Sequence, residues 1–143
     1  MFSKTCEYAI RAVMFIAQKT RDGSRVSVKE VAKGIDSPEY FIAKILQELG
    51  RKGLLQSAKG PSGGFYLDHH TLNQSLADIV RAVDGDKIFS GCGLGLKQCS
   101  ESRPCPIHRQ FKAIRSQLME LLEQSRIGSF SRELEAELTF LRR

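Results

Sequence analysis

Apolar residues recur at helical spacing along the first segment of the chain and predict two helices before residue 35. In residues 2–20 these positions fall on one face, and a turn cluster of charged and small residues follows at 21–24. The segment Ser27–Glu30 matches a capping box, in which the serine and glutamate side chains satisfy free backbone N–H groups at a helix start. A short second helix is therefore predicted from there to about Lys33, with Gly34 as the left-handed residue that ends it.

A third helix is predicted directly after this turn. Ser37 is placed to act as its N-cap, and Pro38 suits the first helical position, where its missing N–H costs nothing. The apolar stripe of this helix comprises Phe41, Ile42, Ile45, Leu46 and Leu49. Two helices joined by a tight turn form a helix-turn-helix, whose second helix commonly enters the major groove of DNA.

Two short strands are predicted after the third helix, in residues 54–58 and 65–67, around the glycine-rich segment 59–64. A hairpin in this position is the wing of a winged helix-turn-helix. Its tip contains Lys59 and Ser62 among glycines, which would let the backbone approach a phosphate or a minor groove closely. The alternative is a solvated β-turn without a DNA contact.

The second half of the chain predicts a helix at 71–83 and a longer one that begins near residue 107. In the longer helix apolar residues alternate four and three positions apart, the a/d rhythm of a helix that packs against a partner helix. These residues are Ile107, Phe111, Ile114, Leu118 and Leu121. We expect this helix to form a homodimer; docking on the first helix of the same chain is the alternative, and both can hold together. A weaker terminal helix is predicted at 129–142.

These elements predict a mainly α fold with a small β-wing, in which a winged helix-turn-helix domain is followed by a long dimerisation helix. We expect a DNA-binding domain at 1–85, a cysteine-rich loop at 86–106, and the dimerisation and C-terminal helices at 107–143. The longest apolar stretch of the first helix, residues 12–17, is far shorter than the ~20 residues that cross a bilayer. With no secretory pattern at the start of the chain, we expect a cytoplasmic protein without a membrane partner.

The charge of the chain favours a polyanionic partner. Among 143 residues, 22 Lys and Arg stand against 16 Asp and Glu, a net charge of +6. Part of this excess is local, because residues 44–59 contain Lys44, Arg51, Lys52 and Lys59 against the single acid Glu48. The basic segment coincides with the predicted recognition helix and wing.

Three of the four cysteines and one of the three histidines lie in the segment 91–108. The ligand candidates there are Cys92, Cys99, Cys105 and His108. The glycines and prolines between them exclude a regular helix or central strand, so the segment is a loop that could wrap a metal centre. Structural zinc sites usually contain a tight Cys-x2-4-Cys pair, and its absence favours an iron–sulfur cluster over zinc. A redox-active disulfide or unliganded cysteines are the other possibilities, and the remaining Cys6 fits the buried face of the first helix.

With these motifs in place, the chain resembles the Rrf2 family of winged-helix transcription regulators, whose cluster-binding members are of the IscR and NsrR types. The resemblance covers residues 1 to about 127. It is carried by Tyr8–Ala12, by Phe41–Leu49, by the wing signature Lys59–Leu67 and by Leu76–Gly85. It implies that Cys92, Cys99 and Cys105 hold a [2Fe–2S] or [4Fe–4S] cluster, with [2Fe–2S] favoured, together with a fourth ligand that is not cysteine.

The resemblance offers two candidates for that fourth ligand. His108, in Cys105-Pro106-Ile107-His108, matches the histidine of the IscR type and is favoured, whereas Glu7 falls where NsrR-type proteins place an acidic ligand from the partner protomer. If they are not ligands, Glu7 would form an ion pair with Arg11 on the helix surface, and His108 would face solvent. One departure is that six residues separate Cys92 from Cys99, where cluster-binding members have five.

The sequence therefore predicts a homodimeric regulator that binds a double-stranded DNA operator and senses iron–sulfur status, oxidants or nitric oxide through a labile cluster. Paired catalytic carboxylates, a nucleophile–base set and a phosphate-cradling motif are missing, so we expect no enzyme activity. The expected DNA contacts are Ser37, Glu39, Tyr40, Ala43 and Lys44 on helix three, and Lys59 and Ser62 on the wing. The rival hypotheses are a cluster-free thiol-switch repressor and an electron-transfer iron–sulfur module.

Overall fold

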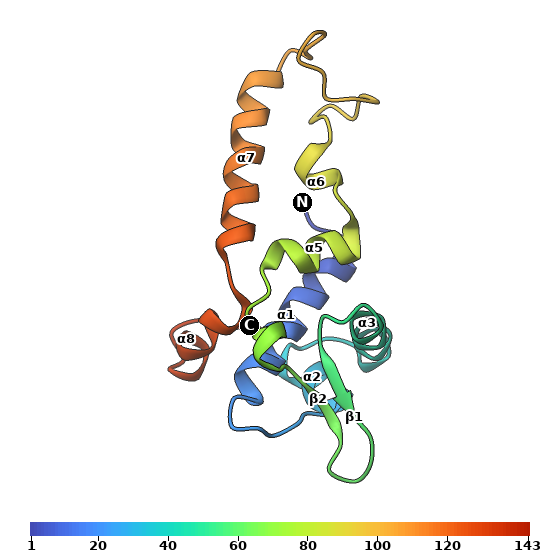
Figure 1. Cartoon of the computed structure of the whole chain (residues 1–143), viewed down its shortest axis with the longest axis vertical. Helices are drawn as coiled ribbons and strands as arrows, with labels where there is room; N and C mark the ends of the chain where they lie inside the picture. The colour runs from blue at the N-terminus through green and yellow to red at the C-terminus, as the bar shows by residue number, and fades with distance from the viewer.

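A computed structural model describes residues 1–143 as a helical body from which one long helix rises (Figure 1). In chain order the elements are α1 (Lys4–Lys19), α2 (Val28–Gly34), α3 (Glu39–Arg51), β1 (Gln56–Ala58), β2 (Gly64–Tyr66), α4 (His69–Leu72), α5 (Leu76–Asp84), α6 (Lys87–Ser90), α7 (His108–Gln124), the 3-10 helix η1 (Ile127–Phe130) and α8 (Ser131–Glu135). The predicted class, mainly α with a small antiparallel β-wing, is confirmed.

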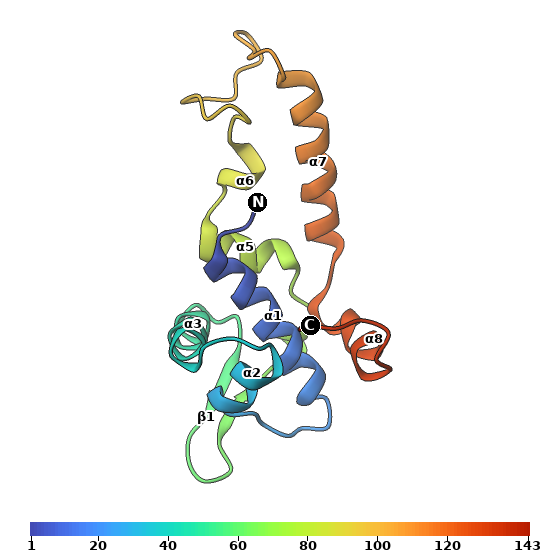
Figure 2. The same ribbon diagram turned by 180° about the vertical axis from the view of Figure 1, so that it is seen from behind.

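Helix α1 lies at the centre of the body, between α3 and α5 (Figures 1 and 2). It begins at Ser3, whose side chain accepts a hydrogen bond from the backbone N–H of Cys6. Its buried face carries small and β-branched residues, among them Ala9, Val13 and Ile16, which let neighbouring helices approach closely. Since the core of the domain forms around α1, the helix-turn-helix is built on its surface.

The capping box predicted at Ser27 and Glu30 is present, but the two ends of the turn differ from expectation. Gly34 lies inside α2, and the left-handed residue is Asp36, with φ of 50°. The glycine serves packing instead, since a Cβ there would lie 2.1 Å from the ring of Phe15 on α1. At the start of α3 the N-cap position is occupied by Pro38, while the Ser37 hydroxyl donates to the Ile35 carbonyl.

The wing is a short antiparallel ladder in which Ser57 pairs with Phe65. A third segment joins it, because Val26 bridges Phe65 with backbone N–H···O distances of 3.0 and 2.7 Å. This close approach depends on Gly64, whose φ is +139° and whose Cβ, if present, would lie 2.6 Å from the Val26 carbonyl oxygen. The segment just before the N-cap of helix α2 is thus tied to the wing.

Replacing Gly64 by alanine is expected to lower the free energy of unfolding by about 2–4 kcal/mol, because an unfavourable φ adds to a clash with backbone. Gly60→Ala is the matched control: its φ of +98° is also positive, but no atom lies within 4 Å of the new Cβ. That variant should lose only about 1 kcal/mol. Urea denaturation measures both, and equal losses would show that the approach to Val26 is energetically unimportant.

The single helix predicted at 71–83 is wrong, because the chain breaks into α4 and α5. Asp68 and Ser75 each begin a separate capping box. At the break, Leu76 N–H donates to the Ser125 carbonyl and Ile127 N–H donates to the Gln74 carbonyl, at 2.9 and 3.0 Å. These long-range bonds fasten the segment after α7 to the body, and they outweigh the local helical pattern.

Helix α7 packs on α5 and α6 and buries only Leu122 completely. Its a/d stripe remains largely open, with Ile114 62% and Leu121 60% exposed. After it, η1 and α8 return to pack on α1, and the regular helix ends at Glu135, so the longer terminal helix predicted at 129–142 is also wrong. None of the helices has the length and hydropathy that crossing a lipid bilayer requires.

Candidate functional site

The N-terminal half of α3 exposes aromatic and basic side chains. Tyr40 is 64% exposed and Phe41 52%, with ring centroids 5.7 Å apart in an edge-on arrangement. Phe41 therefore leaves the buried stripe to which its spacing assigned it. The Lys44 ammonium lies 4.6 Å from the centroid of the Tyr40 ring, while Glu39 is exposed and Ala43 half-buried. This surface has the chemistry of a groove-binding helix, in which aromatic and cationic groups project from a rigid scaffold.

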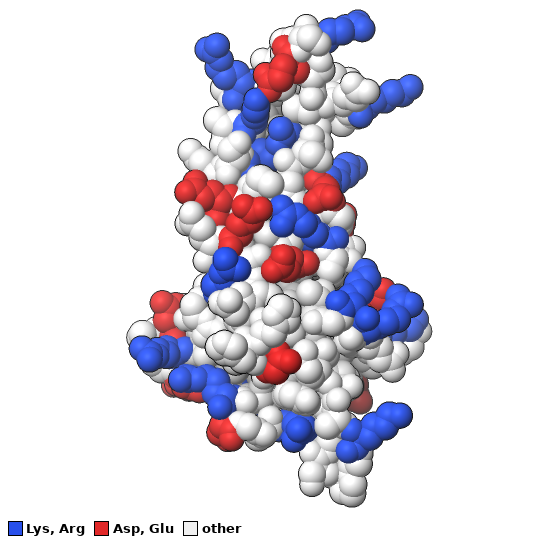
Figure 3. Space-filling view, viewed as in Figure 1, with Lys and Arg blue, Asp and Glu red and all other residues white.

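The basic residues of the segment 44–59 divide into paired and unpaired groups. Arg51 and Lys52 lie 2.5 and 3.6 Å from Glu48 carboxylate oxygens, and the Lys52 ammonium also donates to a backbone carbonyl. Lys44 and Lys59 have no acidic partner. Figure 3 shows Lys and Arg atoms gathered over α3. The charge that remains free for a polyanion thus lies at the start of α3 and at the wing tip.

The glycines of the wing differ in what surrounds them. At the exposed tip, next to Lys59 and Ser62, Gly60 faces open space. Gly63 and Gly64 face backbone instead, since a Cβ on Gly63 would lie 2.3 Å from the Ala58 carbonyl oxygen. Only the tip therefore offers the close backbone approach that the sequence suggested for the whole segment.

The four predicted ligands lie in two pairs. Cys99 Sγ is 3.5 Å from His108 Nδ1. The side chain of Cys105 lies near that of Cys92, and the pKa of the Cys92 thiol is lowered chiefly by the backbone N–H groups of Leu94 and Leu96, with a smaller contribution from Cys105. No three His, Cys, Asp or Glu side chains converge on one point where they could hold a metal ion.

Arg115 on α7 fastens the cysteine loop to that helix. Its guanidinium donates to the Gly91 carbonyl at 2.5 Å and to Cys99 Sγ at 3.4 Å. Gly93 lies flat against Phe111, whose ring atoms would be 2.8 Å from an added Cβ. Sequence reasoning missed Arg115, although it lies two helical turns after the last candidate ligand and so on the same face of α7.

His108 does not face solvent, since its side chain is only 9% exposed. Its Nε2 lies 3.2 Å from a Glu101 carboxylate oxygen, without the geometry of a directed hydrogen bond. Glu101 also pairs with Lys112. Lys112 first, and then His108, hold the pKa of the Glu101 carboxyl below its usual value. The acidic neighbour fixes the imidazole with Nδ1 toward Cys99.

Glu7, the rival candidate ligand, and Cys6, the cysteine outside the loop, both lie on α1 in other surroundings. Glu7 pairs with Lys4 at 3.4 Å, whereas Arg11 donates to the Ile35 carbonyl, so the Glu7–Arg11 ion pair that was the alternative to a ligand role is absent. No ion pair of Glu7 reaches the cysteine loop. Cys6 is completely buried, and burial, followed by the nearby Asp84, raises the pKa of its thiol to about 12. A thiol that stays protonated at neutral pH is a poor metal ligand.

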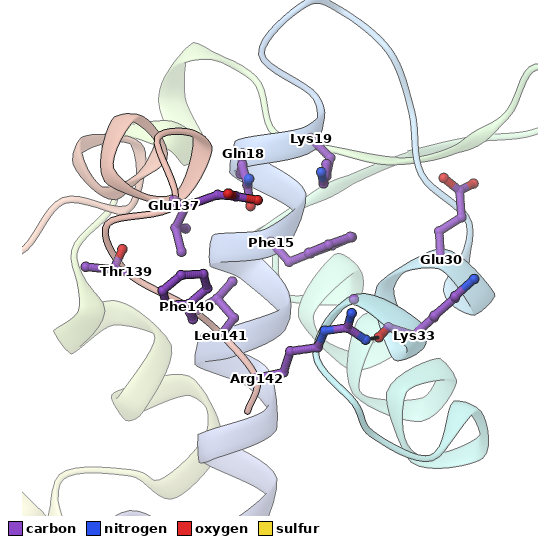
Figure 4. Close-up of a pocket in the computed structure, with 12 residues that line it drawn as sticks. Phe15, Gln18, Lys19, Glu30, Lys33, Glu137, Thr139, Phe140, Leu141 and Arg142 are labelled. Carbon is purple, nitrogen blue, oxygen red and sulfur yellow. Dashed lines mark hydrogen bonds between the residues drawn. The ribbon is translucent and has the colours of Figure 1, made fainter.

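A surface pocket of about 420 Å³ lies elsewhere, between α1, α2 and the last residues of the chain. Figure 4 shows Phe140 and Leu141 directed toward α1 and Phe15 between α1 and α2. Arg142 donates to the Lys33 carbonyl at the end of α2. The lining contains no cysteine or histidine, and the pocket follows from the way the C-terminal segment covers the helix-turn-helix.

A sequence model of the Rrf2 family, described as "Iron-dependent Transcriptional regulator", matches residues 2–133. The chain belongs to the Rrf2 family. It is 33% identical over 129 residues to a protein of Aquifex aeolicus that is described as an HTH-type transcriptional regulator, covering 89% of this chain and 88% of the relative. It is 24% identical over 119 residues to the HTH-type transcriptional regulator NsrR of Bacillus licheniformis, covering 82% of each.

Two solved structures share the fold of this Rrf2 regulator. The global cysteine regulator CymR of B. subtilis aligns with a TM-score of 0.77 at 20% identity, over 92% of this chain and 96% of CymR. The T. potens IscR aligns with a TM-score of 0.71 at 18% identity, over 97% of this chain and 92% of that one. The winged-helix fold is thereby confirmed, and the protein is a transcription regulator rather than an enzyme.

Proposed function

We propose that this Rrf2 regulator is a homodimer that binds a double-stranded operator and senses iron–sulfur status, oxidants or nitric oxide through a labile cluster on its cysteine loop. The observation that carries the proposal is the pairing of Cys99 with His108 and of Cys92 with Cys105 on a loop that Arg115 fastens to α7. The description of the matching family as iron-dependent supports the same reading.

In this proposal α3 of each protomer enters a major groove and the wing contacts the DNA backbone. Tyr40 and Lys44, which project from the start of α3, would contact base edges, and Lys59 would contact phosphate. The remaining contacts that we propose are Ser37, Glu39, Ala43 and Ser62. Ser37 is the least favourable of them, because its hydroxyl is engaged with the Ile35 carbonyl.

The dimer would form along α7. Its exposed apolar residues repeat at the spacing of a helix–helix seam, and an open stripe of this kind is stable in water when a second helix covers it. We place the DNA-binding domain at 1–85, the cluster loop at 86–106 and the dimerisation region at 107–143. The return of η1 and α8 onto α1 ties the last region to the first within each protomer.

The donor set fits an iron–sulfur cluster chemically, because thiolates are the soft ligands that such clusters require and an imidazole can complete the set. Cys92, Cys99 and Cys105 would hold the cluster, with His108 as the fourth ligand and Glu7 of the partner protomer as the rival. When bound, the cluster, [2Fe–2S] by preference, would supply a centre that oxidants and nitric oxide can destroy. The two donor pairs would have to close together around it, which the glycines between Cys92 and Cys99 permit.

The loop is connected to both the DNA-binding domain and the dimer helix, which is what sensing requires. On one side it continues from α5 and α6, which pack on α7. Arg81 of α5 pairs with Glu123 of α7 at 2.9 Å and lies over the ring of Phe89 in α6. A change in how the loop holds α7 would therefore be transmitted to α5, and from α5 to α1, on which the helix-turn-helix is built.

A thiol switch without a cluster is the second candidate, and the proximity of the Cys92 and Cys105 side chains supports it. A peroxide could oxidise these two thiols to a disulfide: the thiols give up two electrons and two protons, and the peroxide is reduced to water. Because the pair lies in the same loop, the disulfide would act on α7 through the same contacts.

The deciding experiment is anaerobic purification with iron and sulfide quantitation, visible and resonance Raman spectra, and selection of bound duplexes from a random library. We expect iron and acid-labile sulfide in the colored protein, and one enriched duplex sequence with two half-sites. Colourless, iron-free protein that still enriches a duplex would favour the thiol switch. A stable, reversibly cycling cluster without any enriched duplex would favour electron transfer and overturn the proposal.

A further inference from the structure

Arg25 lies outside the hairpin in sequence but is brought to the wing by strand pairing. Val26 pairs with Phe65 in antiparallel fashion, and extending this register by one residue places Arg25 opposite Tyr66. Phe65 packs against the core, so the alternation of a strand turns Tyr66 to the outer face of the hairpin. Arg25 and Tyr66 are thus cross-strand neighbours on the outside of the wing.

The side chains of this pair are in contact. The Arg25 guanidinium carbon lies 4.5 Å from the centroid of the Tyr66 ring, the distance of a cation–π contact. Arg25 is exposed and has no acidic partner, which distinguishes it from Arg51 at the end of α3. Because the ring covers one face of the guanidinium and leaves its N–H edges free, the group is held in place while its donors remain available.

The arrangement depends on Gly64. A side chain at this position would meet the Val26 carbonyl, so the third segment can lie against the wing only because residue 64 is glycine. The nearest unpaired cation on the same hairpin is Lys59 at its tip. Two free positive charges, one at the tip and one at the root, therefore lie along one hairpin.

We propose that Arg25, stacked on Tyr66, is a second phosphate-binding residue of the wing and contacts the DNA backbone next to the contact of Lys59. The inference rests on the proposed operator binding and extends it to a residue that lies before the helix-turn-helix in sequence. A planar guanidinium with free N–H edges suits the paired oxygens of a phosphate. A contact to phosphate positions the protein on DNA without reading its sequence.

The test is equilibrium binding of the full-length protein to its selected operator and to an unrelated duplex over a series of salt concentrations. Arg25→Ala is expected to weaken binding to both duplexes about tenfold and to lower the slope of log affinity against log salt by about one unit per protomer. Arg25→Lys keeps the charge and loses the planar stack, so it should retain the slope at reduced affinity. Tyr66→Phe keeps the ring and should bind as the unaltered protein does.

Arg132→Ala on α8 is the matched control, since this arginine is also exposed and without an acidic partner but lies away from the wing (Figure 1). An unchanged salt slope for Arg25→Ala, or a loss confined to the operator, would overturn the phosphate assignment. If Lys59→Ala lowers the slope and Arg25→Ala does not, only this inference fails. If the unaltered protein selects no duplex at all, the proposed function fails instead. Urea denaturation confirms that each variant is folded.

Discussion

Replacing Lys44 and Lys59 together by alanine is expected to abolish selective operator binding at near-physiological salt. Lys59 is the free cation of the wing tip, so its loss should weaken binding to every duplex and lower the salt slope by about one unit per protomer. Lys44 projects from α3 beside Tyr40, where loss of a base-edge contact costs about 1–3 kcal/mol per position. The visible spectrum of the cluster should not change, because neither residue contacts the cysteine loop.

Arg51→Ala combined with Glu48→Ala is the control for this double variant. Arg51 lies on the same helix as Lys44, but Glu48 neutralises it at 2.5 Å. Because removal of the whole exposed ion pair leaves the net charge of α3 unchanged, the control should bind nearly as the unaltered protein does. Fluorescence anisotropy with the selected operator measures both proteins. If the cluster-loaded double variant keeps its operator affinity, α3 and the wing do not dock on DNA as proposed.

The local signals in the sequence predicted the helix-turn-helix and the wing, because caps, turn residues and apolar spacing act within a few residues. The capping box at Ser27 is an example, since both partners lie inside one helical turn. Errors arose where a distant segment decided the outcome. Gly34 is required by a ring on α1, and the break before Leu76 is stabilised by backbone bonds to the segment after α7.

The same distinction applies to the candidate sites. Spacing and residue type placed all the thiols of the loop together, but the division of the ligands into two pairs arises from docking on α7 through Arg115. Composition located a basic segment at 44–59, but it could not separate Lys44 from residues that Glu48 neutralises. The position of Arg25 on the wing could not be predicted from its sequence neighbours. It results from the pairing of Val26 with Phe65, which lies 39 residues later in the chain.

Single replacement of Cys92, Cys99 or Cys105 by alanine is expected to remove the cluster chromophore and to reduce bound iron to background. Thiolates are the only strong soft donors in the loop, so loss of one leaves a position that no neighbour can fill. Cys6→Ala is the matched control, because this thiol is buried in the body and its pKa of about 12 keeps it protonated. Iron and sulfide quantitation after anaerobic purification gives the comparison. A Cys99→Ala protein with a complete cluster would refute the three-cysteine assignment.

The fourth ligand follows from the same series of variants. His108→Ala should alter the visible spectrum and speed the loss of the cluster in air, since its Nδ1 lies 3.5 Å from Cys99 Sγ on the same protomer. Glu7→Ala should leave both nearly unchanged, because Glu7 pairs with Lys4 on the surface of α1. The opposite pattern would transfer the ligand role to Glu7 of the partner protomer. The cluster would then bridge two chains, and its loss would act directly on the dimer rather than through the contact of Arg115 with the loop.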